Sequence, residues 1–125
     1  MSNFQEGLYW IRSRDGGTVL DVPSFDTRAQ VIGTTKQSTP LFNPEQNLAQ
    51  LWLVEALQNL QIYRIRNLAT GLVLDVQGKS SEEGTPIIAY TQTQNANQHW
   101  MIEWVKDEVE HDQCVFITLF IRSEC

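Results

Sequence analysis

The chain has 125 residues, of which 42% are hydrophobic and 19% are charged. This composition is typical of one globular domain that can build a core without disulfides, and it excludes a disordered chain. The net charge of −6 at pH 7, with no cluster of Lys and Arg in the sequence, disfavours binding to nucleic acid or to an anionic membrane surface.

Neither end of the chain predicts a membrane segment. The amino terminus, "MSNFQEGLYW", has no basic segment followed by an apolar core, so no secretory signal is expected. The longest strongly apolar run, "CVFITLFI", is too short to span a bilayer. Cys114 and Cys125 are the only cysteines and fit a reduced, cytoplasmic setting better than a disulfide framework, although they could pair. Release by a non-classical route stays open.

The first half of the chain reads as four short strands separated by turns. Alternating apolar and polar residues, or short apolar runs, predict strands at "LYWIR" (8–12), "TVLDV" (18–22), "QVIGTT" (30–35) and "LWLVEA" (51–56). "DGG" (15–17) predicts a tight connection between the first two. Pro40 and Pro44 predict a longer loop before the fourth strand, where a missing N–H costs little.

The second half predicts the same order of elements. Strands are expected at "IYRIR" (62–66), "LVLDV" (72–76), "PIIAYT" (86–91) and "HWMIEW" (99–104), with a tight turn at "ATG" (69–71). A further strand is expected within "CVFITLFI" (114–121), after which the sequence stops.

These elements form an internal repeat. "YWIRSRDGGTVLDV" lies over "YRIRNLATGLVLDV" at a constant offset that pairs Tyr9 with Tyr63 and Asp21 with Asp75. "QLWLVE" likewise lies over "QHWMIE". Such self-similarity signals supersecondary units that share a core. We expect a single domain (1–125) with repeat one at about 7–56, repeat two at about 61–105 and a partial third repeat at about 113–125.

The motifs resemble the ricin B-type (R-type) lectin family, especially its small fungal members. Leu-Asp-Val, a loop and Gln-x-Trp occur in this order in both complete repeats, and the resemblance covers roughly residues 7 to 105. It implies an all-β fold, the β-trefoil, in which three four-stranded units close a barrel and its cap. The third repeat of this chain is expected to be incomplete.

The Gln-x-Trp motif has a structural explanation. Trp52 and Trp100 each offer a large apolar surface to the shared core and an indole N–H that needs a partner. Gln50 and Gln98 can satisfy backbone groups of the adjacent bend. We therefore expect both glutamines to be structural first.

The resemblance implies a carbohydrate site in the second repeat. In the family, an aspartate accepts two hydroxyl protons through charge-assisted bonds, an aromatic ring stacks on the sugar and an asparagine binds a hydroxyl. Asp75, Tyr90 and Asn97 stand at these positions. Gln98 would support the loop or touch the sugar, and the backbone of Gly78 would approach the ligand.

The sequence departs from the family pattern at several positions. Ile88 stands where ricin-like members can have a polar residue, which leaves the hydroxyl specificity open. In the first repeat Asp21 is kept, but Thr34 falls near the aromatic position and Ala49 replaces the asparagine, so no sugar binding is expected there. Taken singly, Asp75 also fits a turn carboxylate and Tyr90 an ordinary cross-strand aromatic.

A single site per chain has consequences for affinity and assembly. We expect binding between millimolar and high micromolar, about 4–6 kcal/mol, so that crosslinking of glycans would need oligomers. The missing strands of the third repeat would leave sheet edges unpaired. A truncated chain, an incomplete gene product and a homodimer whose partner supplies the edge are the alternatives.

No catalytic or metal site is predicted. His111 and Cys114 have His-x-x-Cys spacing, but a second ligand pair is absent from the sequence. No nucleophile elbow or phosphate-binding glycine loop occurs. Nothing positions a carboxylate pair for glycoside hydrolysis. We therefore expect neither an enzyme nor a cofactor.

The function expected from the resemblance is that of a lectin for galactose- or N-acetylgalactosamine-type glycans on glycoproteins or glycolipids, with a role in defence. The alternative is a trefoil protease inhibitor that acts through exposed loops at 23–29, 36–48 or 77–85. A third possibility is a sugar-binding accessory module of an enzyme.

Overall fold

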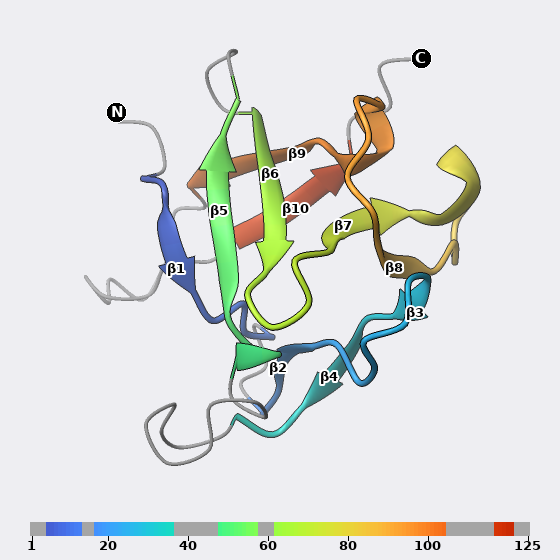
Figure 1. Cartoon of the computed structure of the whole chain (residues 1–125). Coiled ribbons are helices and arrows are strands. Elements are labelled where there is room, and N and C mark those ends of the chain that lie inside the picture. Colours follow the sequence, from blue (N-terminus) through green and yellow to red (C-terminus); the bar gives the residue numbers. More distant parts are fainter. Residues whose placement is uncertain (1–4, 14–16, 37–47, 58–61, 105–116, 122–125) are drawn as a thin grey trace.

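The computed structural model describes residues 5–13, 17–36, 48–57, 62–104 and 117–121 (Figure 1). Within these ranges the protein consists of β-strands and two short 3-10 helices, η1 (Gln77–Lys79) and η2 (Ala96–Gln98). The strands are β1 (Gly7–Tyr9), β2 (Val19–Asp21), β3 (Ala29–Gln30), β4 (Ile32–Thr34), β5 (Trp52–Ala56), β6 (Ile62–Asn67), β7 (Val73–Val76), β8 (Ile87–Tyr90), β9 (Trp100–Trp104) and β10 (Ile117–Ile121). No helix in the described ranges is long and apolar enough to cross a membrane.

Every strand predicted from the sequence overlaps an observed strand, which confirms the all-β prediction. The prediction of one strand at 30–35 was wrong, because the segment forms β3 and β4 with Val31 between them. The break has a physical reason: β3 pairs with β8 of the second repeat, whereas β4 pairs with β2 of its own repeat. One straight strand could not serve both partners.

Some expectations lie outside the described residues. These are most of the "DGG" turn, the loop with Pro40 and Pro44, and the positions His111, Cys114 and Cys125.

The repeats share a common pairing scheme. Each first strand lies beside a fourth strand: β1 pairs with β5, β5 with β6, β6 with β9 and β9 with β10, all antiparallel. The second strand of each repeat pairs with the last strand before its Gln-x-Trp motif, giving the hairpins β2–β4 and β7–β8. Figure 1 shows β1, β5 and β6 side by side, with the two hairpins at the edge of this group. The hairpins thus carry their loops away from the long strands.

The two Gln-x-Trp tryptophans occupy equivalent places in the core. Trp52 is 0% and Trp100 is 2% exposed. The indole N–H of Trp52 donates to the carbonyl oxygen of Leu20, and that of Trp100 to the carbonyl oxygen of Leu74, each over 3.1 Å. The predicted core position and the predicted partner for each indole N–H are confirmed, and each tryptophan bonds the second strand of its own repeat. The buried cluster consists of Ile11, Val22, Trp52, Val54, Tyr63, Ile65, Leu74, Val76, Ala89, Trp100 and Ile102.

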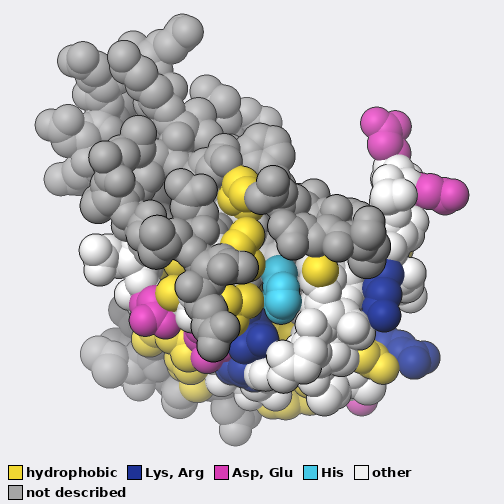
Figure 2. Space-filling model, turned by 90° about the horizontal axis from the view of Figure 1, so that it is seen from above, with side chains coloured by type: hydrophobic (Ala, Val, Ile, Leu, Met, Phe, Trp, Pro, Cys, Tyr) yellow, Lys and Arg dark blue, Asp and Glu magenta, His cyan; other side chains and the backbone are white. Residues whose placement is uncertain are grey.

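One face of the protein shows where some of the described basic side chains lie (Figure 2). On the face shown in Figure 2, Lys and Arg side chains form separate groups with uncharged and hydrophobic surface between them.

Candidate functional site

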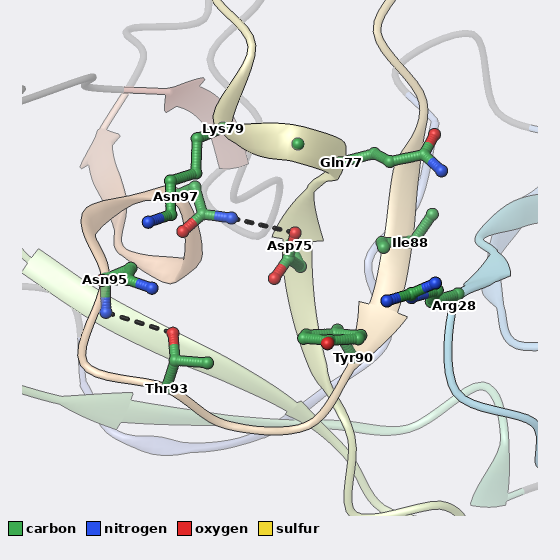
Figure 3. Close-up of a pocket in the computed structure, with 10 residues that line it drawn as sticks. Arg28, Asp75, Gln77, Lys79, Ile88, Tyr90, Thr93, Asn95 and Asn97 are labelled. Atoms are coloured by element: carbon green, nitrogen blue, oxygen red, sulfur yellow. Dashed lines mark hydrogen bonds between the residues drawn. The ribbon is translucent and has the colours of Figure 1, made fainter.

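A pocket of about 470 Å³ lies on the β7–β8 hairpin of the second repeat, against the loop that leads through η2 to β9. Figure 3 shows its side chains converging from these segments and from the first repeat. The residues that line it are Arg28, Asp75, Gln77, Gly78, Lys79, Ile88, Tyr90, Thr93, Asn95 and Asn97. Four of the five residues predicted from the sequence, Asp75, Gly78, Tyr90 and Asn97, are among them.

The register of the hairpin brings the carboxylate and the aromatic ring together. Asp75 pairs with Ile88, and Val73 pairs with Tyr90. Since side chains alternate along a strand, Ile88 and Tyr90 lie on the same face as Asp75, opposite it and diagonally across from it. The floor of the pocket is therefore a carboxylate beside an apolar side chain and a phenol ring.

The carboxylate of Asp75 is held from two sides. Its Oδ1 accepts a 3.0 Å hydrogen bond from Asn97, and its Oδ2 accepts a 2.8 Å hydrogen bond from Gln98. Each carboxylate oxygen can accept a second hydrogen bond, and Asp75 lines the pocket. The side chain is only 4% exposed. Burial raises the pKa of Asp75 above its ordinary value of 3.8, against the opposing hydrogen bonds and the positive charge of Lys79.

Asn97 positions Asp75 and leaves one acceptor unused. Its Nδ2 donates to Oδ1 of Asp75 and, over 3.1 Å, to the carbonyl oxygen of Val76. Both partners are acceptors, which fixes the orientation of the amide. Its Oδ1 is buried and has no hydrogen-bond partner among the described residues. The N–H groups of Asn97 are thus engaged within the protein, and its oxygen is the atom left without a partner.

Gln98 lies beneath the pocket and does not line it. It is 0% exposed, and its Nε2 donates to Oδ2 of Asp75 and, over 2.9 Å, to the carbonyl oxygen of Thr91. Its Oε1 accepts a 2.7 Å hydrogen bond from the N–H of Thr93. The sequence left two roles open for Gln98, support of the loop or contact with the sugar, and this geometry corresponds to support.

Gly78 forms part of the rim through its backbone. Its φ of 66° lies in the left-handed region, which favours glycine, and a Cβ built there would meet no atom within 4 Å. The space above Gly78 is thus open to the pocket.

The sequence did not single out Arg28 or Lys79. Arg28 comes from the first repeat, and its N–H donates a 2.8 Å hydrogen bond to the carbonyl oxygen of Ala89 in β8. Its guanidinium carbon lies 5.6 Å from the centre of the Tyr90 ring, within range of a cation–π interaction. Arg28 reaches this pocket through the pairing of β3 with β8, and no local sequence motif predicts that pairing.

The first repeat builds the same frame around different side chains. The pairs Val19–Thr34 and Asp21–Ile32 correspond to Val73–Tyr90 and Asp75–Ile88. Thr34 thus occupies the aromatic position, as the sequence predicted. Its hydroxyl donates to Oδ2 of Asp21 over 2.7 Å, and Nε2 of Gln50 donates to the same oxygen over 3.2 Å. This aspartate lacks both a ring and an asparagine beside it.

Among the described residues, no group of three or more His, Cys, Asp or Glu side chains could hold a metal ion.

Comparison with solved structures relates the chain to sugar-binding proteins. A lectin from Polyporus squamosus, solved with Neu5Acα2-6Galβ1-4GlcNAc bound, is 30% identical with a TM-score of 0.69. The match covers 83% of this chain and 35% of the lectin chain, so the chain spans about a third of that protein. An exo-β-1,3-galactanase from Clostridium thermocellum is 30% identical with a TM-score of 0.65, over 82% of this chain and 20% of the enzyme.

The designed three-fold symmetric protein ThreeFoil is 26% identical with a TM-score of 0.65, over 76% of this chain and 63% of its own. These likenesses agree with a β-trefoil fold. No curated protein matches the chain in sequence. The sequence profile of ricin-type beta-trefoil lectin-like domains matches residues 2–90 and 48–113, which together span most of the chain. The chain belongs to the ricin-type beta-trefoil lectin domain-like family.

Proposed function

We propose that the chain is a lectin that binds galactose- or N-acetylgalactosamine-type glycans through the pocket of the second repeat. One observation carries the proposal: the carboxylate of Asp75, fixed by Asn97 and Gln98, stands beside the ring of Tyr90 in a single open pocket. A carboxylate held in this way does not need to reorganise when a ligand arrives, which lowers the cost of binding.

The polar and aromatic groups of the pocket suit both the hydroxyls and the apolar C–H face of a galactose ring. Galactose presents two adjacent hydroxyls, at C3 and C4, and an apolar face of C–H groups. A carboxylate such as Asp75, with one hydrogen bond to each oxygen, suits a pair of adjacent hydroxyl donors. Tyr90 offers an apolar surface to the C–H face, and Asn97 lines the same pocket beside the carboxylate.

The relatives support this ligand class. The Polyporus squamosus lectin was solved with a glycan that contains galactose, and the Clostridium thermocellum enzyme is a galactanase. Both are about 30% identical to this chain. For a single shallow site we expect a dissociation constant between millimolar and high micromolar, about 4–6 kcal/mol.

The test compares the two equivalent aspartates. Binding of galactose, N-acetylgalactosamine and glucose is measured by calorimetry and on a glycan array for the wild type, Asp75→Ala and Asp21→Ala. We expect galactose-type sugars to bind, glucose to bind less, and only Asp75→Ala to abolish binding while circular dichroism shows a retained fold. Galactose binding that survives Asp75→Ala, or that is lost in a folded Asp21→Ala protein, would refute the assignment to the second repeat.

A further inference from the structure

The pocket carries a positive charge excess that a neutral sugar does not use. Its lining residues include two cations, Arg28 and Lys79, and one acid, Asp75. The other lining residues are uncharged. This local excess contrasts with the net charge of −6 for the whole chain. A chain that is acidic on average therefore surrounds this pocket with more positive than negative charge.

Both cationic residues have an unusual backbone conformation. Arg28 has a φ of 73° and Lys79 a φ of 56°, and they are the two non-glycine residues with positive φ in the described part of the chain. Left-handed backbone is unfavourable for a residue with a Cβ, and such strain concentrates where a site requires a particular side chain. Glycine would fit the conformation better at both positions, but would bring no charge to the pocket.

The two cations differ in what they already contact. Lys79 is close enough to Asp75 for its charge to lower the pKa of that carboxyl group. Arg28 faces the ring of Tyr90, and no described acid forms an ion pair with it. Its five N–H donors suit an oxyanion, and a carboxylate or sulfate can accept two of them at once. Figure 3 places Arg28 at the Tyr90 side of the pocket and Lys79 at the Asn97 side.

We propose that the pocket prefers saccharides that carry an anionic substituent, a sulfate or a carboxylate, and that Arg28 binds this group while the sugar ring rests on Tyr90. This inference rests on the proposed lectin function and specifies its substrate class. The backbone N–H of Arg28 donates a hydrogen bond to Ala89 in β8. Because Ala89 directly precedes Tyr90, this bond holds the Arg28 side chain close to the Tyr90 ring. Arg28 thereby adds a residue of the first repeat to the pocket of the second repeat.

The test uses the ratio of two affinities. Galactose, galactose 6-sulfate and galacturonic acid are titrated into the wild type, Arg28→Gly, Arg28→Gln and Arg12→Gln at low salt. Arg28→Gly removes the guanidinium and relieves the positive φ, so it folds at least as well as the wild type. Arg12 is exposed and does not line the pocket, so Arg12→Gln controls for the change in net charge.

We expect the wild type to bind at least one acidic sugar about tenfold more tightly than galactose, the size expected for one charge-assisted pair. In both Arg28 variants this ratio falls to about one, whereas Arg12→Gln keeps it. The two acidic sugars tell sulfate from carboxylate. Raising the salt to about 0.5 M should reduce the preference, because the guanidinium is exposed.

Other results overturn the inference. If galactose binds in an Asp75-dependent way but neither acid is preferred, the preference for anionic sugars is wrong and the lectin proposal stands. If the preference survives in Arg28→Gly, Arg28 does not bind the anionic group, and the lectin proposal again stands. If no sugar binds the wild type, the proposed function fails, and this inference fails with it.

Discussion

Thr34 donates a hydrogen bond of 2.7 Å to Oδ2 of Asp21, at the position in the first repeat where the second repeat places Tyr90 beside Asp75. The hydroxyl that replaces the ring occupies part of the carboxylate's capacity to accept hydrogen bonds. Gln50 binds the same oxygen and also donates to Thr34 and to the carbonyl oxygen of Thr35. One frame therefore yields an internally bonded cluster in one repeat and an open pocket in the other.

The first prediction concerns stability in the first repeat. Replacing Asp21 by Ala removes the acceptor of Thr34 and one acceptor of Gln50, which is 1% exposed. We expect the free energy of unfolding to fall by about 1–3 kcal/mol, the cost of leaving buried donors short of a partner. Urea unfolding followed by tryptophan fluorescence measures it. An unchanged unfolding midpoint would show that this cluster contributes nothing to stability.

The second prediction separates two neighbours, Gln98 and Asn97. Gln98 joins β7 to the loop that follows β8 through three hydrogen bonds and is fully buried. We expect Gln98→Ala to lower the free energy of unfolding by about 2–3 kcal/mol. Asn97 lines the pocket and bonds Asp75 from the ligand side. Asn97→Ala should therefore lower galactose affinity more than it lowers stability.

The measurement for this pair is urea unfolding and calorimetric titration of both variants at a temperature where both are folded. Asn97→Asp serves as a further variant, because it keeps the size of the side chain but places a second carboxylate against Asp75. It should also lose affinity. A Gln98→Ala protein that is as stable as the wild type would contradict the structural role of this glutamine.

Much of the second-repeat pocket could be predicted because the chain resembles the ricin B-type lectins, whose site positions are matched by Asp75, Tyr90 and Asn97. The duplicated Leu-Asp-Val and Gln-x-Trp motifs indicated equivalent positions, and the hairpin register then placed Asp75 near Tyr90. Short strands with clear alternation are also read well from sequence, and β6 shows this alternation of half-buried and buried side chains.

The parts that could not be predicted depend on contacts between repeats. Arg28 reaches the pocket only through the pairing of Ala29 with Ala89, and the break at Val31 arises because β3 and β4 have different partners. Neither feature has a local sequence signal. The orientation of the Asn97 amide was also beyond the sequence, since it follows from the two acceptors that surround its Nδ2.

The third prediction is a pH dependence of sugar binding. Hydroxyl donors bind the ionised carboxylate of Asp75, and burial raises the pKa of this group above 3.8. Galactose affinity should therefore fall on acidification, with a midpoint above that of an ordinary aspartate. Calorimetry between about pH 4 and pH 7 tests this in a range where the fold is checked by circular dichroism. Affinity that stays constant down to a pH of about 4 would contradict it.

The same pKa shift predicts the sign of an effect on stability without ligand. Because the folded pKa lies above the unfolded one, the folded state binds more protons in the window between them. The contribution of Asp75 to stability is fully present below the unfolded pKa and is lost as the pH rises through the folded pKa. The stability of the wild type relative to Asp75→Asn should therefore increase as the pH falls through this window. Urea unfolding of both proteins at several pH values measures the difference, and a decrease would mean that the fold favours the ionised form.

The last prediction concerns the ring of Tyr90. If the ring serves as an apolar platform, Tyr90→Phe should keep galactose affinity within about twofold, whereas Tyr90→Ala should lose about 1 kcal/mol or more, roughly fivefold. Phe25 is 68% exposed and does not line the pocket, so Phe25→Ala controls for the loss of a surface aromatic.

Calorimetry at one temperature compares the three variants with the wild type. An equal loss in Tyr90→Phe and Tyr90→Ala would assign the contribution to the phenol hydroxyl instead of the ring. Full affinity in Tyr90→Ala would place the sugar away from this side of the pocket. The sugar would then no longer be expected close to Arg28, which lies beside the Tyr90 ring. The result for Tyr90 therefore decides whether the carboxylate and the cation act on the same bound sugar.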